Sequence, residues 1–157
     1  MVPGMTAEQG RKGKTAKRDR PLLDDPSARA AAASAAERLA AGLQDGLDRA
    51  DADAYDGQFA SDVLWGSPYG AALRGYAALN AIHRSLMAAG AAPPSRYQVV
   101  QLMSPQPGIA IAHVRRDDLT AGQGGQFSEM AMYVLVERDG QWWLAAGQNT
   151  PITERPA

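Results

Sequence analysis

Several residue types that build chemical sites are missing or scarce in this chain. No cysteine occurs among its 157 residues, which excludes a disulfide framework, a thiolate nucleophile and a zinc–thiolate site. With only two histidines, a histidine-rich metal centre is not expected. No apolar run approaches the length that crosses a membrane. The net charge is −1, so no overall field attracts nucleic acid or an acidic surface.

The remaining composition is that of a soluble globular protein, with 45% hydrophobic and 21% charged residues. Its length suits one domain, which we expect at residues 26–152 with a short C-terminal tail at 153–157. Residues 1–25 are polar and basic and lack the apolar segment of a secretory signal, so we expect a cytoplasmic protein. This segment is either an arm for nucleic acid or anionic lipid, or a disordered tail with too little apolar surface to fold. We favour the tail.

Helical patterns come first in the chain and strand patterns later. Leucines every four residues and a run of alanines predict a first helix from Pro26 to about Arg49, capped by Asp25; we expect the alanines to favour the helix rather than to pack. A short helix follows, with Tyr55 and Phe59 four apart on one face as core residues. The pattern ends in a mostly antiparallel sheet, which indicates the α+β class. The further elements expected are a strand at 63–65, a helix at 76–87 and strands at 97–103 and 109–116.

The last stretch of the chain, residues 127–150, predicts a β-hairpin turning at Asp139-Gly140. Both faces of this hairpin are apolar, whereas a sheet with one wet face alternates apolar and polar residues. We therefore expect the protein's own helices to cover the inner face and a second subunit to cover the outer face. The outer residues are Met132, Val134, Val136 and Trp143. The expected pairs on the inner face are Leu135 with Leu144, Tyr133 with Ala146, and Ala131 with Gln148.

A series of short motifs follows the predicted elements in order. They are Asp51-Ala-Asp-Ala-Tyr, Ser67-Pro-Tyr-Gly, Leu73-Arg-Gly, Ile109-Ala-Ile-Ala-His, Leu135-Val-Glu-Arg-Asp-Gly, and Trp142 through Ala145-Ala-Gly-Gln-Asn-Thr. This order resembles the nuclear-transport-factor-2-like superfamily, which includes SnoaL-like cyclases and ketosteroid isomerases. Within it, the motifs are most similar to the SgcJ/EcaC family of enediyne and related natural-product clusters.

The resemblance implies a cone-shaped α+β barrel, in which a strongly curved sheet wraps around three N-terminal helices and encloses a pocket. It also implies a hydrophobic, polyketide-type ligand and cofactor-free cyclisation, isomerisation or hydration. The alternative is a non-catalytic module for ligand binding or dimerisation. Ketosteroid isomerases carry their general base just before the proline of the bend, where this chain has Ser67. A serine does not shuttle protons near neutral pH without an activating base, so Ser67 is a substrate-binding candidate only.

Three residues are candidate catalytic groups. Glu129 is expected near the open end of the cone as an acid or base, or else as a solvated residue at the start of a strand. Tyr133, deeper on the same face, either binds a substrate oxygen or finds a backbone partner. His83, on an apolar helix face, is either a catalyst or a satisfied core residue. His113, in the middle of a strand, is a weaker candidate for substrate binding with the same alternative.

The other substrate-binding candidates frame the expected pocket. Gln148 offers donor and acceptor groups in an apolar strand, as a ligand contact or as a structural hydrogen bond to a loop. We expect Asn149 to point the other way, toward the subunit interface or the strand end. Trp65 and Tyr69 flank the bend, where they either stack on a planar ligand or plug the cone. No phosphate-cradling glycine loop or dinucleotide fingerprint follows a strand, so no cofactor is expected.

Overall fold

The computed structural model describes residues 18–120 and 127–153, so most of the predicted basic tail and of the predicted C-terminal tail lies outside the described residues. The described chain is an α+β domain, which confirms the predicted fold class. Its elements are α1 (Arg29–Asp48), α2 (Ala52–Tyr55), β1 (Phe59–Gly66), β2 (Ala72–Arg74), α3 (Tyr76–Ala88), β3 (Ser95–Met103), β4 (Ile109–Asp118), β5 (Glu129–Arg138) and β6 (Gln141–Pro151).

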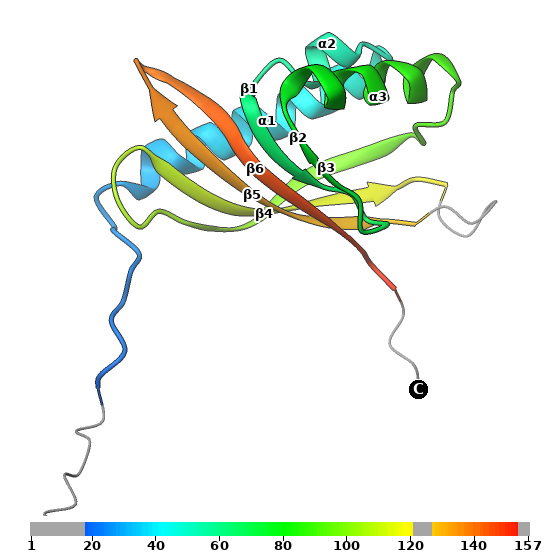
Figure 1. Ribbon diagram of the computed structural model, residues 1–157. Helices are drawn as coiled ribbons and strands as arrows, with labels where there is room; N and C mark the ends of the chain where they lie inside the picture. Colours follow the sequence, from blue (N-terminus) through cyan, green and yellow to red (C-terminus); the bar gives the residue numbers. More distant parts are fainter. Residues whose placement is uncertain (1–17, 121–126, 154–157) are drawn as a thin grey trace, which may run out of the picture.

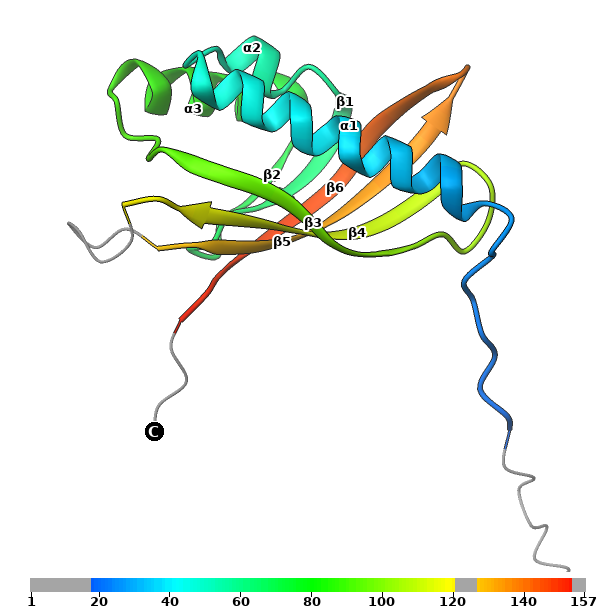
Figure 2. The ribbon, with the colours of Figure 1, turned by 180° about the vertical axis from the view of Figure 1, so that it is seen from behind.

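The strands form one curved, unclosed sheet in the order β2-β1-β6-β5-β4-β3. All neighbouring strands are antiparallel except β1 and β6, which run parallel. Helix α1 crosses the inner, concave face, and α2 and α3 close one end of it (Figures 1 and 2). The hairpin β5–β6 therefore lies in the middle of the sheet, where its inner face looks toward the helices.

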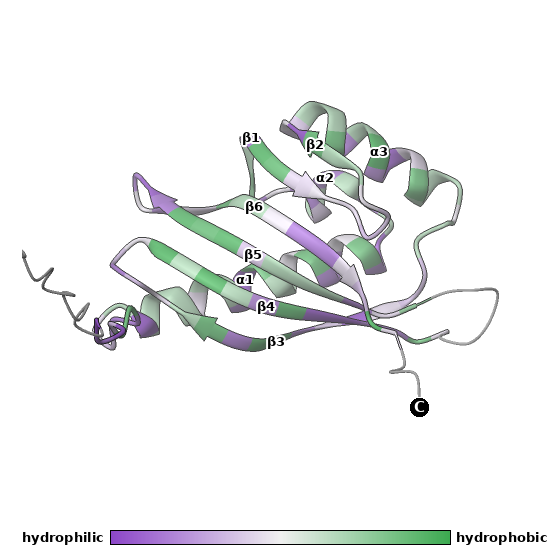
Figure 3. Ribbon diagram, turned by 60° about the horizontal axis from the view of Figure 1, so that its bottom comes forward, coloured by the Kyte–Doolittle hydropathy of each residue, from purple (hydrophilic) through white to green (hydrophobic). Residues whose placement is uncertain are grey.

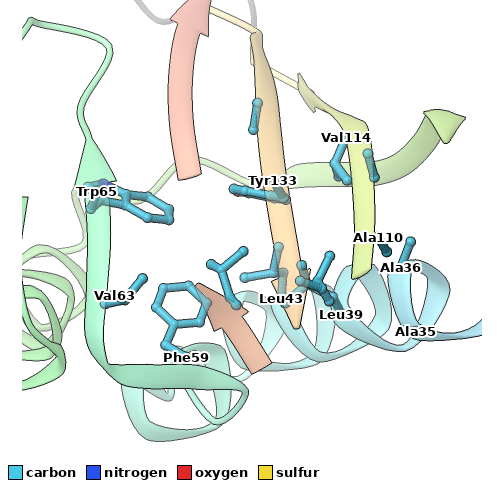
Figure 4. Close-up of a cluster of buried hydrophobic side chains, with 14 of the residues drawn as sticks. Ala35, Ala36, Leu39, Leu43, Phe59, Val63, Trp65, Ala110, Val114 and Tyr133 are labelled. Atoms are coloured by element: carbon cyan, nitrogen blue, oxygen red, sulfur yellow. The ribbon is translucent and has the colours of Figure 1, made fainter. Parts of the chain in front are cut away.

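The core lies between α1 and the inner face of the sheet. Leu39 and Leu43 of α1 belong to one buried cluster with Leu135 and Leu144 of the hairpin. Figure 4 shows Leu39 and Leu43 within this cluster. The expectation that the alanine run does not pack was wrong. Three of its alanines are fully buried, because their small side chains let the helix backbone lie close to alanines of β4. The buried alanines are Ala32, Ala35 and Ala36 on the helix and Ala110 and Ala112 on β4.

Two local predictions for the N-terminal half were also wrong. Asp25 does not cap α1: its carboxylate accepts hydrogen bonds from the backbone N–H and the hydroxyl of Ser27, and the helix starts only at Arg29. The short helix α2, capped by Asp51, ends at Tyr55. Phe59 is therefore the first residue of strand β1 rather than a helix-face partner of Tyr55, although the two rings still lie 6.4 Å apart.

The predicted register of the hairpin holds only near its turn. Leu135 pairs with Leu144 as expected, but Val134 pairs with Ala146, so Ala145 is an extra residue in β6. Such a bulge moves every later side chain to the opposite face. Gln148 pairs with Met132 and is exposed on the outer face, whereas Asn149 is buried on the inner face, which reverses both sequence expectations.

Candidate functional site

A cavity of about 450 Å³ opens between the concave face of the sheet, α3 and the loop that follows α3. This volume lies within the range of small-molecule sites, roughly 300–1,000 Å³. Most of the predicted site residues line it, together with apolar side chains of α3 and a few polar groups that sequence reasoning did not select. The predicted residues found there are Trp65, Ser67, Tyr69, His83, Glu129 and Tyr133.

His83, which lines the cavity, forms a pair with an aspartate that does not itself line it. His83 Nδ1 lies 2.6 Å from Asp56 Oδ1, and the side chain of Asp56 is fully buried. A carboxylate accepts hydrogen bonds and does not donate them, so Nδ1 carries the proton of this contact. In the neutral imidazole, Nε2 is then an acceptor that can take a proton from a ligand. Burial among the rings of Tyr55 and Trp65, at 5.1 and 5.7 Å between centroids, fixes the plane of the imidazole.

Asp56 is held in turn by a network that reaches the surface. Its second oxygen, Oδ2, accepts a hydrogen bond from Asn80 Nδ2 at 3.0 Å. The Asn80 oxygen accepts from Arg84 Nε at 2.9 Å, and Arg84 also pairs with the exposed carboxylate of Asp53. In the sequence, the only sign of this network is that Asn80 and His83 are three residues apart on one helix. Their partner, Asp56 in the α2–β1 turn, can be identified only from the structure.

A second polar group in the cavity is a pair of tyrosines. The hydroxyls of Tyr55 and Tyr97 lie 2.7 Å apart, so one donates to the other. Burial raises the pKa of Tyr55 to about 12, with the hydrogen bond to Tyr97 acting in the opposite direction. Burial also raises the pKa values of Tyr97 and Tyr133 well above their ordinary value of 10.0. All three phenols therefore stay protonated and neutral at physiological pH.

We expect the folded protein to lose stability as the pH rises above about 10. The unfolded chain releases these tyrosine protons near pH 10, while the folded protein retains them. The contribution of these protons to the free energy of unfolding is therefore complete below pH 10 and is lost toward pH 12. The raised pKa of Tyr55 alone accounts for a loss of about 2–3 kcal/mol in the free energy of unfolding. Urea unfolding at pH 8 and at pH 11 measures the loss, and Tyr55→Phe should make it smaller. Equal tyrosinate absorbance of folded and denatured protein at pH 11 would contradict this prediction.

An ion pair lines the cavity beside the tyrosines. Arg116 Nε donates to Glu129 Oε2 at 3.1 Å, and both side chains are largely buried. The other guanidinium nitrogens donate to Ser95 Oγ at 2.8 Å and to the carbonyl oxygen of Phe127 at 3.0 Å. Burial alone would lower the pKa of Arg116, but the charge of Glu129 and its hydrogen bond outweigh that effect and raise it. Glu129 is thus a paired side chain of the cavity wall.

Tyr133 and Trp65 meet across the floor of the cavity. Their rings stack with centroids 6.1 Å apart, and each points toward the other in Figure 4. Gly147, which pairs with Tyr133 in the sheet, makes this possible, because a Cβ there would lie 2.9 Å from the Tyr133 ring and 3.1 Å from the Trp65 ring. The glycine of the Ala-Gly-Gln-Asn-Thr motif therefore makes room for the tyrosine.

The bend before β2 forms the mouth of the cavity. Tyr69 is 82% exposed there, with its ring edge on Phe127 at 5.7 Å between centroids. The Ser67 hydroxyl accepts hydrogen bonds from the backbone N–H groups of Tyr69 and Ala71. Ser67 thus shapes the bend, and no activating base contacts it among the described residues.

Two predicted site residues do not line the cavity. Gln148 lies over Gly66 on the outer face, and its Nε2 donates to the backbone oxygens of Ser67 and Asn149 at 3.4 and 3.0 Å. Gln148 therefore forms a structural hydrogen bond to a loop, which is the alternative to a ligand contact. His113 also faces outward, where Nδ1 lies 3.1 Å from Gln101 Oε1. The bulge at Ala145 places Gln148 on the outer face, and strict alternation along β4 places His113 there.

No cluster of metal-binding side chains occurs in the described ranges 18–120 and 127–153. Within the same ranges, no helix is both long enough and apolar enough to cross a membrane.

Residues 40–145, more than half of the chain, match the profile of a family described as "SnoaL-like domain". A search of curated proteins found no match. Solved structures share the fold at low sequence identity, as three examples show. One is a domain of unknown function with a cystatin-like fold from Nostoc punctiforme, 18% identical over 79% of each chain, with a TM-score of 0.68.

The second is an NTF-2 like protein of unknown function from Shewanella oneidensis MR-1, 13% identical over 75% of this chain and 98% of that one, with a TM-score of 0.65. The third is a ketosteroid isomerase-like protein from Erwinia carotovora atroseptica, 16% identical over 77% of this chain and 96% of that one, with a TM-score of 0.61. Likenesses at this identity establish the fold and leave the reaction open.

Proposed function

This chain belongs to the SnoaL-like domain family, and from that premise we propose that its cavity binds a hydrophobic, polyketide-type intermediate and that His83 moves a proton on it. The observation that carries the proposal is the contact of His83, in the cavity wall, with the fully buried Asp56. Such a pair orients the imidazole and offsets the positive charge that forms when Nε2 takes a proton. Cyclisation, isomerisation and hydration all require a proton transfer of this kind.

The rest of the cavity suits a role in positioning the ligand. Apolar side chains of α3 and the rings of Trp65 and Tyr133 form a hydrophobic surface, and a few polar groups fix the orientation of the ligand. Glu129 is a weaker candidate for the acid or base, because it is already paired with Arg116. The ordered motifs of the sequence support the finer placement in the SgcJ/EcaC family, with an enediyne-like or related substrate.

The chain contains a matched pair of histidines for testing this proposal. We expect His83→Gln to slow the cyclisation of a synthetic poly-β-ketone thioester by about 10²–10⁴-fold, the usual contribution of a positioned acid or base. His113→Gln, on the outer face, should leave the rate unchanged. Product formation is followed by liquid chromatography and mass spectrometry. Equal rates for the two variants would refute the catalytic role. The non-catalytic alternative, a ligand-binding module, predicts a retained ligand in native mass spectra and no turnover.

We also propose a homodimer formed through the outer face of the sheet. Val136 pairs with Trp143, and Val134 and Met132 continue this face, with Met132 47% exposed. In Figure 3, strand β4 changes from hydrophobic at its start to hydrophilic at its end. Its hydrophobic start pairs with Val136 of β5. An apolar area of this kind favours a partner of the same shape.

Trp143→Glu is expected to convert the dimer into a monomer, because a carboxylate at the centre of the interface would be buried without a partner. Sedimentation at micromolar concentration measures the change. Gln148→Glu, at the polar end of the same face, is the control and should remain dimeric. A wild-type protein that sediments as a stable monomer would contradict the proposal.

A further inference from the structure

Two polar side chains in the cavity lack protein partners. Tyr133 and Asn149 are 2% and 7% exposed, and both line the cavity. Neither the Tyr133 hydroxyl nor the Asn149 side-chain amide has a hydrogen-bond partner in the described part of the chain. The only completely enclosed polar side-chain atom without a partner there is Asp118 Oδ2, so both groups are reachable from the cavity. Buried polar groups are rarely left without a partner, so a molecule that enters the cavity can supply one.

These two side chains lie together on the inner face of the hairpin. Tyr133 pairs with Gly147, and Asn149 is two residues further along β6, opposite Ala131. The missing side chain at Gly147 leaves the Tyr133 ring lying across β6 toward Trp65, whose ring also contacts His83. Tyr133 and His83 therefore lie near the same indole, and Asn149 shares the inner face two residues beyond Gly147.

The charges of the cavity argue against an anionic ligand. The guanidinium of Arg116 is already bound by Glu129, Ser95 and the Phe127 carbonyl, so it offers no free positive charge. Burial keeps Tyr133 protonated by raising its pKa, so its hydroxyl is a neutral donor. An amide N–H of Asn149 is a second neutral donor. Two neutral donors that line one apolar cavity suit an oxygen that carries partial rather than full charge.

We propose that the Tyr133 hydroxyl and the Asn149 amide together bind one carbonyl oxygen of an uncharged ligand. This inference rests on the proposed function, because it names the chemical group that the same cavity holds. The two hydrogen bonds would polarise the carbonyl and would strengthen as negative charge develops on its oxygen. The sequence predicts such a contact for Tyr133 but predicts that Asn149 points away from the cavity.

Three naphthalene compounds of matched shape test the assignment on the full-length protein. These are 2-acetylnaphthalene, a ketone; 2-isopropenylnaphthalene, in which a methylene group replaces the carbonyl oxygen; and 2-naphthoate, a carboxylate. We expect the ketone to bind roughly tenfold more tightly than the alkene, from two hydrogen bonds of ordinary net strength. The infrared carbonyl stretch of the bound ketone should move to lower frequency. Tyr133→Phe and Asn149→Leu should each weaken ketone binding and reduce that shift, while alkene binding is retained.

His113→Gln, on the outer face and outside the cavity lining, is the control and should change neither affinity nor frequency. Equal affinity for ketone and alkene, or tightest binding of the naphthoate, would overturn the carbonyl assignment while leaving the pocket function in place. Failure of all three compounds to bind would overturn both. Retained ketone preference and frequency shift in both Tyr133→Phe and Asn149→Leu would also overturn the assignment, whatever the stability of those variants.

Discussion

Gly46→Ala is expected to destabilise the fold by about 3 kcal/mol, near the upper end for overpacked positions. A Cβ at residue 46 would lie 2.3 Å from the backbone N and 2.4 Å from the Cα of Tyr55. Backbone atoms cannot move aside as the end of a flexible side chain can. The glycine is therefore kept inside α1 although alanine is the better helix former by about 1 kcal/mol.

The same helix supplies the control for this prediction. A Cβ at Gly42 would meet only Nε2 of Gln58, at 2.8 Å, which is the far end of a flexible side chain. We therefore expect Gly42→Ala to be neutral or to stabilise the protein by up to about 1 kcal/mol through helix propensity. Urea unfolding followed by circular dichroism compares the two variants. If both alanines change the free energy of unfolding equally, α1 and α2 do not approach each other as closely as the structure places them.

Asp56→Ala is the second change with a large expected effect, about 3 kcal/mol of stability, because it removes a fully buried carboxylate and leaves a buried donor unsatisfied. The substitution leaves the Nδ1–H of His83 without the acceptor it has in the structure. It also removes the shortest of the three contacts of Asn80 Nδ2, which keeps the Ala52 carbonyl and Asp53 Oδ1 as acceptors. Ligand binding should weaken as well, because the imidazole loses the contact that fixes its orientation.

Asp53→Ala is the matched control for Asp56→Ala. Asp53 is a neighbouring carboxylate that also forms an ion pair, with Arg84, but both side chains of that pair are more than half exposed. Water and salt screen such a pair, so we expect a loss of about 1 kcal/mol or less. The difference between the two variants in thermal unfolding and in denaturant midpoint isolates the effect of burial. A loss for Asp56→Ala no larger than that for Asp53→Ala would show that the pair with His83 is not buried in solution.

The sequence predicts the fold class and the inner position of Tyr133, because alternation along β5 and the Asp139-Gly140 turn are local signals. It does not predict the end of the hairpin. The bulge at Ala145 has no distinctive sequence, and one extra residue exchanges the faces of Gln148 and Asn149. A pattern of alternation counted from the turn therefore fails beyond the bulge.

The role of Asp56 in the site cannot be predicted from the sequence for a different reason. It follows a short helix in a stretch with three other aspartates nearby, and nothing local distinguishes it from exposed Asp53. Only the packing of α3 against α2 brings His83 and Asn80 onto its carboxylate. Similarly, the burial of the α1 alanines depends on β4, which is distant in the sequence. Long-range packing, rather than local propensity, decides these positions.

The imidazole tautomer of His83 tests the central claim most directly, since the account requires Asp56 to hold Nδ1–H so that Nε2 faces the cavity. Nitrogen-15 NMR of the full chain gives two imidazole patterns, one for each histidine, and His83→Gln assigns them. We predict that neutral His83 is protonated at Nδ1 in the wild-type protein, that Asp56→Asn abolishes this preference, and that 2-acetylnaphthalene shifts the Nε2 signal of His83 and not that of His113. A neutral His83 protonated at Nε2, or an Nε2 signal that the ketone leaves unchanged, would contradict the account.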